Sequence, residues 1–571
     1  YITDNSTQEI LRNKQSYYVR DLFNRFTQYD AGTGKLINHL PDGAIKDVAH
    51  HRSTSYTFRN VLNYNFNNDL WSASAMIGCE MFAIRTQMET DTFYGYDPQG
   101  LTFNTTMNFK DLVTTGVTGF SPSAGRQKLS YNPQHGDAED RYFSTFFTGN
   151  VSYADRYVLF GSVRYDKTNL YGRSGKYRDQ PTWSIGGKWN VSSESFFEVP
   201  VINQLGIKLS YGLSGNIDKS TSPYLIAENT RDVRTGLPVL NIRNPENKEL
   251  GWEKVYTFNA GVNLGLFDDR LNLTVDYYNR KTEDALGFSM MDPTSGWSSV
   301  KKNTASLFNR GVDLSVGGYP VSTKEVRWNT SLTFSYNYNE VTKVNSGVTT
   351  PQSVLSGNPV EGKPVDYLFY YRAGKLTAEG APTILDNAGH ELAWNSSVQV
   401  EDMRFGRKSP QIFGAWSNTV SCKGFDLSMM FTYKMKYEVR MPSVAGSYGS
   451  YKTFDQRWRK PGDEENTWVP KPLHGSFNYT FQNVVDGSDK QLEKGNMIRL
   501  KSVGLAYDFK RLVKTDVLSA LSLKFSVENP WFWASNRDGL DVDRLYESTN
   551  STVFYSGKQP TYYTFTLNVK F

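Results

Sequence analysis

The stretch "YTFNAGVNLGLFDDRLNLTVDYYN", residues 256–279, contains two runs in which apolar and polar side chains alternate. Every second residue from Tyr256 to Leu266 is apolar, and so is every second residue from Leu271 to Tyr277. A period of two places the apolar side chains on one face of a β-strand and the polar ones on the other. Two aspartates, Asp268 and Asp269, lie between the runs and predict a turn. The stretch therefore predicts a β-hairpin with one apolar and one polar face.

The same pattern recurs along the chain. Residues 425–437, "FDLSMMFTYKMKY", carry apolar side chains at alternate positions, while the other face holds Asp426, Lys434 and Lys436. A polar and charged face over about ten residues does not fit the dry interior of a β-sandwich. It fits a barrel whose outer face meets lipid and whose lumen is wet.

The composition supports this fold class. Aromatic residues make up 14% of the chain, with 36 Tyr and 34 Phe, yet the mean hydropathy is −0.53. No stretch approaches 18 consecutive apolar residues, so no membrane-spanning helix is expected. Lys and Arg number 63 against 58 Asp and Glu, a balance that predicts no nucleic-acid partner. We therefore predict an all-β chain that forms a large antiparallel transmembrane β-barrel of the outer-membrane type.

The expected connections are of two lengths. Short turns are predicted at 67–69, 154–155 and 268–269. Long polar connections are predicted at 97–140, 214–250, 280–308, 343–410 and 438–495. Short periplasmic turns and long extracellular loops are typical of outer-membrane barrels. About fifteen strands are expected, in one barrel domain over residues 1–571 with no internal boundary.

Aromatic side chains in the long loops are candidates for contacts with a substrate or a partner protein. They could stack on sugars or clamp a peptide, and they could equally pack the loops against one another. The candidates are Trp297, Tyr367, Tyr370, Tyr371, Trp394, Trp458 and Trp468.

The run "NRDGLDVD", residues 536–543, offers a weaker candidate for a calcium site. Asp538, Asp541 and Asp543 supply the oxygen ligands that calcium prefers, although without the spacing of a known calcium loop. The alternative is a solvated acidic loop. Calcium in the loops is the only cofactor that the sequence suggests.

Histidines and cysteines suggest no further site. No histidine has the spacing of a metal site, and no nucleophile–histidine pair is evident, so no enzymatic activity is expected. We expect all six histidines to be exposed loop residues: His39, His50, His51, His135, His390 and His474. Cys79 and Cys422 are expected to be small apolar side chains and not a disulfide.

The C-terminal stretch is "YYTFTLNVKF", residues 562–571. Its apolar positions share one face of the predicted strand, with an aromatic residue in last place: Tyr563, Phe565, Leu567, Val569 and Phe571. This arrangement resembles the signal by which outer-membrane barrels are recognised and closed by the insertion machinery, and it implies a Gram-negative type of envelope.

A series of motifs resembles the barrel of SusC/RagA-type TonB-dependent outer-membrane transporters of Bacteroidetes. The most specific is "NPENKELGWEKVYTFNAGVNLGLFDDRLNLTVDYYNRKTEDAL", residues 244–286. The family has there Asn-Pro, Leu-x-Trp-Glu-Lys, a Gly-Leu-Phe turn and Asp-Tyr-Tyr-Asn. The other motifs are "IKLSYGLSGN" (207–216), "NTASLFNRGVDLSV" (303–316), "EGKPVDYLFYYRAGKL" (361–376), "RWRKPGD" (457–463), "NMIRLKSVGLAYDF" (496–509) and "LKFSVENPWFWASNRDGLDVD" (523–543).

The motifs follow the order of the family over residues 50–571, whereas residues 1–50 match poorly. Ala305 and Asp313 replace the usual Gly and Glu of the third motif. The N-terminal domain, the TonB box, the plug and the first strands of the family are not visible. The resemblance therefore implies the middle and C-terminal part of a barrel whose plug is not in this chain.

The resemblance implies that the protein imports nutrients across the outer membrane. The chain would cross this membrane several times and contact its lipid. The nutrients would be oligosaccharides or oligopeptides, captured with a SusD-like surface lipoprotein. Energy would come from the TonB complex through the missing N-terminal part, and the two-protein complex could form a dimer. The alternatives are a passive porin and a scaffold barrel in a secretion or adhesion complex.

Overall fold

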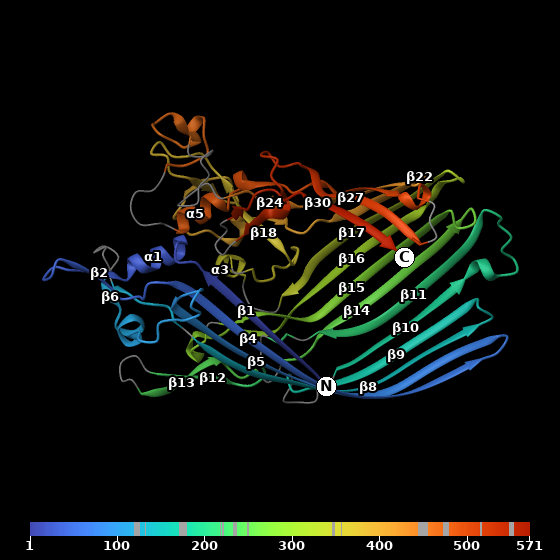
Figure 1. Ribbon diagram of the computed structural model, residues 1–571, viewed down its shortest axis with the longest axis horizontal. Coiled ribbons are helices and arrows are strands. Elements are labelled where there is room, and N and C mark those ends of the chain that lie inside the picture. Colours follow the sequence, from blue (N-terminus) through green and yellow to red (C-terminus); the bar gives the residue numbers. More distant parts are fainter. Residues whose placement is uncertain are drawn as a thin grey trace. The chain divides into compact units, whose positions relative to one another are not determined.

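A computed structural model describes residues 1–118, 126–131, 133–170, 180–216, 218–219, 222–231, 237–247, 250–297, 299–344, 349–355, 357–442, 455–471, 479–513, 517–547 and 553–571. Sixteen strands form one antiparallel sheet (Figure 1). In the order of the sheet they are β1 (Ile2–Arg12), β4 (Ala44–Asn67), β5 (Trp71–Tyr96), β8 (Gln134–Tyr153), β9 (Tyr157–Thr168), β10 (Gln180–Asn190), β11 (Ile202–Asn216), β14 (Glu253–Leu266), β15 (Leu271–Met290), β16 (Ser299–Ser322), β17 (Val326–Val344), β22 (Ile412–Cys422), β23 (Phe425–Met435), β26 (Met497–Asp508), β27 (Ala520–Ala534) and β30 (Tyr562–Lys570).

The connections between these strands carry the remaining elements. The short strands are β2 (Thr27–Asp30), β3 (Lys35–Asn38), β6 (Val117–Thr118), β7 (Arg126–Gln127), β12 (Ile226–Arg231), β13 (Pro238–Asn244), β18 (Tyr367–Ala373), β19 (Thr383–Leu385), β20 (Glu391–Ala393), β21 (Met403–Arg407), β24 (Glu438–Arg440), β25 (Leu492–Lys494), β28 (Leu545–Glu547) and β29 (Val553–Tyr555). The helices are α1 (Tyr17–Arg25), α3 (Pro351–Leu355) and α5 (Tyr479–Asp486), with single turns η1 (Lys110–Thr115), η3 (Val191–Ser193), η4 (Pro293–Ser295), η5 (Val400–Asp402), η7 (Asp463–Glu465), η8 (Asp489–Gln491), η9 (Phe509–Arg511) and η10 (Val542–Arg544). No helix among the described residues is long and apolar enough to cross a membrane.

The hairpin predicted from residues 256–279 is formed by β14 and β15. Their register runs without a break from Leu266 opposite Leu271 to Lys254 opposite Glu283. The turn bends through positive φ at Asp268 and also at the next residue, with φ of 57° and 60°, a conformation that aspartate tolerates better than most residues. The predicted short turns at 67–69 and 154–155 also join consecutive strands.

Short and long connections alternate along the sheet. Residues 68–70, 154–156, 267–270, 323–325 and 423–424 join consecutive strands directly. Between them lie long connections such as those from β17 to β22 and from β23 to β26. Because neighbouring strands are antiparallel, alternate connections leave the sheet at the same end, as the predicted turn-and-loop layout requires.

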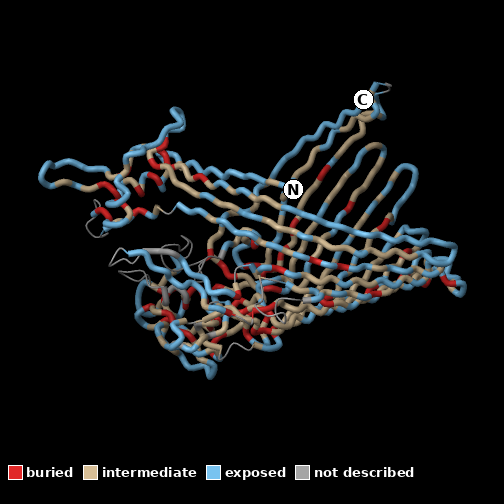
Figure 2. The backbone as a smooth tube through the Cα atoms, turned by 90° about the horizontal axis from the view of Figure 1, so that it is seen from below, coloured by how far each residue is buried: buried red, intermediate tan, exposed pale blue. Residues whose placement is uncertain are grey.

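Large apolar side chains on the strands are exposed rather than buried. On β4 the side chains of Phe58, Leu62 and Tyr64 are 62%, 70% and 62% exposed, and they occupy alternate positions that share one face. Buried residues lie mainly in the connections (Figure 2). This is the inverse of a soluble sheet, and it is the pattern expected when lipid covers the apolar face.

The other face of the sheet is polar and hydrogen-bonded. Lys208 on β11 pairs with Asp276 on β15 at 2.8 Å, reaching across β14. Further along, the side-chain amide of Asn337 donates to the hydroxyl of Tyr278 at 2.6 Å. Such cross-strand polar pairs fit the wet inner face that the sequence predicts.

Aromatic side chains repeatedly cover glycines on the neighbouring strand. In each case a Cβ on the glycine would overlap the ring or its hydroxyl, so glycine is needed to leave room. The pairs within the sheet are Phe146 over Gly78, Phe160 over Gly186, Tyr278 over Gly311 and Tyr433 over Gly414. These contacts link the high aromatic content to the glycines, because a ring laid across a strand covers backbone that has no side chain of its own.

The chain divides into two compact units, and each has its own packing. The first contains Tyr1–Leu62, Ile77–Phe146 and Tyr165–Leu170. Its apolar cluster lies around α1 and includes Leu22, Phe26 and Leu112. The second contains Asn63–Met76, Phe147–Arg164 and Tyr171–Phe571.

Two loop predictions were wrong. Residues 280–308 are mostly strand, because β15 continues to Met290 and β16 begins at Ser299, and residues 134–140 belong to β8. β4 and β5 have 24 and 26 residues, whereas a membrane crossing needs about 9–11. Strand that extends beyond the membrane is wet on both faces, so it lacks the apolar alternation on which the prediction relied.

Three of the six histidines were misplaced for the same reason. His50 and His51 lie on β4, and His135 lies on β8. His39 and His390 lie in connections as predicted, whereas His474 is outside the described residues.

Replacing Gly311 by alanine should destabilise the sheet. The new methyl group would overlap the Tyr278 hydroxyl and the backbone oxygen of Tyr336, and forced overpacking costs about 1–3 kcal/mol. The expected result is a lower temperature for the heat-induced shift from folded to unfolded mobility on SDS gels. Gly317→Ala is the control, because it lies on the same strand and a Cβ there meets nothing closer than 3.8 Å. Equal transition temperatures for both variants would contradict the prediction.

Candidate functional site

Three of the seven candidate aromatics lie on a small sheet within the connection from β17 to β22. Four strands pair there in the order β20-β19-β18-β21. Tyr367 to Tyr371 on β18 pair antiparallel with Arg407 to Met403 on β21. The strand thereby presents three of the candidate tyrosines, at positions 367, 370 and 371.

This sheet has its own apolar core. Its buried residues are Val354, Val360, Tyr371, Ile384, Met403 and Val484. Because Val484 comes from α5, in the connection from β23 to β26, two long connections contribute to one packed body. We call this cluster and the four-stranded sheet the loop core.

Tyr367 and Tyr371 are structural members of the loop core. The Tyr371 side chain is 7% exposed. The Tyr367 hydroxyl donates to the backbone oxygens of Val354 at 3.0 Å and Asn358 at 2.8 Å, and burial raises the pKa of Tyr367 to about 12. Both rings therefore help to hold the loop together, and Tyr371 offers little surface to a ligand.

Trp394 and Trp468 pack against α5. The Trp394 ring meets Phe481 edge-on with centroids 5.4 Å apart, and Trp468 packs against the buried pair Phe481 and Val485. The guanidinium of Arg537 lies 5.5 Å from the centre of the Trp468 ring, a cation–π contact that joins the connection after β27 to this body.

Trp458 is fixed by three contacts, two within its own connection and one with the connection from β17 to β22. Its ring nitrogen donates to Glu464 at 3.0 Å, and the ammonium of Lys471 lies 5.6 Å from the ring. The ring also covers Gly380, where φ is +75° and a Cβ would overlap the indole. Trp458 thus connects its own loop to the connection that carries the four-stranded sheet.

Two candidates belong to neither the loop core nor the cluster around α5. Tyr370 is half-buried on β18, and desolvation raises its pKa. Trp297 is half-buried in the connection from β15 to β16 and belongs to none of the apolar clusters that the described residues form. The structure therefore brings six of the seven candidates together and leaves Trp297 apart, while their role in ligand binding stays a prediction.

The acidic run after β27 forms ion pairs. Asp541 is fully buried and accepts a hydrogen bond from Arg499 on β26 at 2.5 Å. Asp543 accepts from the same guanidinium at 3.1 Å and from Lys434 at 2.7 Å. Asp538 stays half-exposed beside Arg537. Among the described residues no three His, Cys, Asp or Glu side chains are placed to hold a metal ion, and calcium binding here stays a prediction.

Arg499 was missed by sequence reasoning. The available signal was a charged residue at an alternating position of the strand "MIRLKSVGLAYD", residues 497–508. The Asp541 carboxylate also accepts the backbone N–H of Asp543 at 3.2 Å and of Gln559 at 3.1 Å. The Arg499–Asp541 pair therefore anchors both ends of the β27–β30 connection to the inner side of the sheet.

The last strand carries the predicted C-terminal pattern. Phe565 and Tyr563 lie opposite Phe525 and Val527 on β27, and the rings of Phe525 and Phe565 are 4.7 Å apart. Every residue of β30 is exposed. Recognition of this strand by the insertion machinery stays a prediction.

Replacing Arg499 by glutamine should strongly destabilise the β27–β30 connection. The substitution leaves the buried Asp541 carboxylate without a cation, which typically costs about 3–5 kcal/mol. We expect faster tryptic cleavage after Arg544 and a lower heat-unfolding temperature. Arg459→Gln is the control, because its pair with Asp455 is exposed and such pairs contribute about 0–1 kcal/mol. Cleavage rates that match between the two variants would show that the buried pair does not hold the connection.

Comparison with known proteins identifies the family. The sequence model described as "TonB dependent receptor-like, beta-barrel" matches residues 3–381. The chain belongs to this family of TonB-dependent receptor β-barrels. The match begins at residue 3 and therefore includes most of residues 1–50, where the motifs match poorly; β1 and the first half of β4 are part of the large sheet.

Individual relatives confirm the predicted resemblance to SusC/RagA-type receptors. TonB-dependent receptor SusC of Bacteroides thetaiotaomicron is 24% identical over 74% of this chain and 44% of its own length. TonB-dependent receptor P3 of Formosa agariphila is 27% identical over 76% of this chain and 46% of its own length. The structure of a RagAB peptide importer in an "open-open" state matches with a TM-score of 0.71 at 21% identity, covering 92% of this chain and 56% of that one.

These matches confirm the barrel fold and the outer-membrane location of the chain. The chain spans about half the length of the curated relatives it matches. The transport activity of the whole protein is therefore stated below as a proposal.

Proposed function

We propose that this chain is the barrel part of an outer-membrane importer of nutrients that is energised by TonB. The observation that carries the proposal is the match to the TonB-dependent receptor barrel over residues 3–381. The polar inner face and the exposed apolar outer face of the strands support it, since a barrel that conducts solutes through a membrane needs both.

The loop core supports capture of substrate with a SusD-like surface lipoprotein. Long connections without cores of their own would make a poor platform for a partner protein. Here Tyr371, Ile384 and Met403 are at most 7% exposed and give two connections a packed interior. A preorganised surface loses less entropy on binding than mobile loops do.

The substrate class proposed is an oligosaccharide or an oligopeptide. Aromatic rings favour sugars only when a ring face is free. Tyr367, Tyr371 and Trp394 are used in packing, so they do not decide between the two classes. Tyr370 and Trp297 keep part of their surface accessible in either case.

Gentle detergent extraction from native outer membranes tests the partners. We expect mass spectrometry of the purified assembly to find a plug-bearing TonB-dependent segment and a surface lipoprotein in stoichiometric amounts. The bound ligand would then name the substrate class. A chain that emerges with an unrelated stoichiometric partner and no plug would support the scaffold barrel instead.

Uptake in the native host tests the energy source. Deletion of the coding sequence should reduce uptake of the cognate labelled oligomer at least tenfold, and a protonophore should do the same in the undeleted strain. An importer driven by TonB needs the proton-motive force, whereas a passive porin does not. Uptake that depends on the chain but survives the protonophore would favour the porin.

A further inference from the structure

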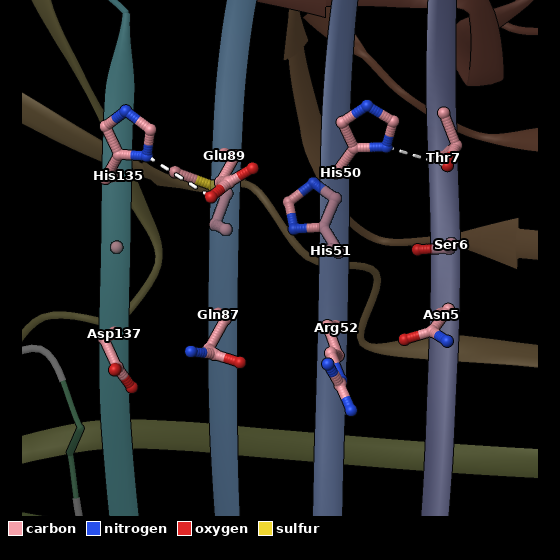
Figure 3. Close-up of a pocket in the computed structure, with 12 residues that line it drawn as sticks. Asn5, Ser6, Thr7, His50, His51, Arg52, Gln87, Glu89, His135 and Asp137 are labelled. Carbon is pink, nitrogen blue, oxygen red and sulfur yellow. Dashed lines mark hydrogen bonds and ion pairs between the residues drawn. The ribbon is translucent and has the colours of Figure 1, made fainter.

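Four strands of the first compact unit carry a polar surface that is separate from the loop core. At one level of the sheet Asn5 on β1, Arg52 on β4, Gln87 on β5 and Asp137 on β8 lie side by side (Figure 3). The next level holds His50 and His135. Together these side chains line a pocket of about 510 Å³.

The pocket lies on the same face as the apolar side chains that meet lipid. The register between β1 and β4 is unbroken from Ile2 to Arg12, so Arg52 shares a face with Tyr56 and Phe58, which are 58% and 62% exposed. Four residues separate Arg52 from Tyr56, which is about 13 Å of strand. For a strand tilted by about 40° this is about 10 Å along the membrane normal, slightly more than the headgroup layer of about 5–8 Å, so Arg52 lies at the outer edge of the headgroups.

An aromatic pair marks the edge of the apolar zone. The rings of Tyr1 and Tyr56 lie 5.1 Å apart on adjacent strands, as expected where a barrel face reaches the membrane interface. Beyond them the same face of β4 continues with Thr54, Arg52 and His50. On this face of β4 the side chains therefore change from aromatic to hydrogen-bonding within a few residues.

The charges of the pocket leave one cation available. The Arg85 guanidinium binds both oxygens of Asp137, at 2.9 and 2.5 Å. The Glu89 carboxylate lies 3.5 Å from the His135 ring, which compensates its charge only when the ring is protonated. Arg52, in contrast, has no ion-pair partner among the described residues. Its neighbours across the strands, Asn5 and Gln87, carry amide groups that can donate hydrogen bonds.

We propose that this pocket binds a phosphate group, presented by the headgroup of a membrane lipid. The planar guanidinium of Arg52 offers paired N–H donors that match two phosphate oxygens. The side-chain amides of Asn5 and Gln87 donate from either side. The acyl chains of the same lipid would lie along Tyr56 and Phe58, so one ligand uses both the polar and the apolar part of the face.

The histidines could instead form a metal site, but their positions do not favour one. His50 is hydrogen-bonded to Thr7 at 3.1 Å, and His135 pairs with Glu89. No three metal-binding side chains converge among the described residues. The donors around Arg52 instead suit an anion.

The test uses the full assembly purified in a neutral detergent and counts bound lipid by native mass spectrometry. Dioleoyl phosphatidylglycerol is titrated against dioleoylglycerol, which has the same chains and no phosphate. We expect saturable binding of phosphatidylglycerol, at least tenfold weaker in Arg52→Gln, and no comparable binding of dioleoylglycerol. Equal binding of the two lipids, or no loss in Arg52→Gln, would overturn the proposal.

Arg59→Gln is the matched control, because it removes one charge from the opposite face of the same strand. Arg59 lies 5.1 Å over the Phe146 ring and pairs with Glu80 at 3.7 Å. Its lipid binding should equal that of the unchanged protein, and heat-modifiable gel mobility confirms that both variants are folded. A titration with inorganic phosphate tells a lipid headgroup from a free anion. If the free anion binds through Arg52 and the lipid binds no more tightly, the phosphate site stands, but the proposal that a membrane lipid supplies the phosphate is wrong.

Discussion

Hydrogen bonding between neighbouring strands is the constraint on which the rest of this molecule depends. Lipid offers no partner for a backbone N–H or C=O, so each strand that crosses the membrane must pair along its length. The sheet meets this demand with sixteen strands in one antiparallel order. Once the backbone is paired, each side chain only has to match the solvent that it faces. Phe58 and Leu62 can therefore lie on the outer surface of the sheet without destabilising it, because lipid covers them.

Apolar packing then moves from the sheet to the connections. A soluble protein buries its large side chains between layers, whereas here the membrane covers them. The connections are in water and must supply their own cores, as the clusters around Phe26 and around Tyr371 do. Buried charge fixes them to the strands as well: Asp541 leaves water entirely, and Arg499 with two backbone N–H groups replaces its hydration.

The period-two pattern was sufficient to predict the strands that cross the membrane. Strands β14 and β23 have the predicted bounds within a few residues, and β15 begins where predicted, although it continues to Met290. The pattern fails where strands leave the membrane, as at His50 and His135, because both faces are then wet and polar side chains no longer alternate with apolar ones. Pairs such as Arg499 with Asp541 join positions 42 residues apart, and no local signal in the sequence relates them.

The loop aromatics show why composition alone does not define a binding site. Tyr, Trp and Phe serve recognition and packing through the same property, a large apolar surface with a polar edge. What separates the two uses is whether a ring face stays accessible after the loop has folded. Tyr371 and Trp394 pack against Ile384, Phe481 and their neighbours. In the proposed importer they would therefore hold rigid the surface on which other residues meet the ligand. If the proposed function holds, substitutions of these packed rings would alter capture of any substrate alike. Discrimination between substrates would then come from partly exposed side chains that belong to neither cluster, such as Tyr370 and Trp297.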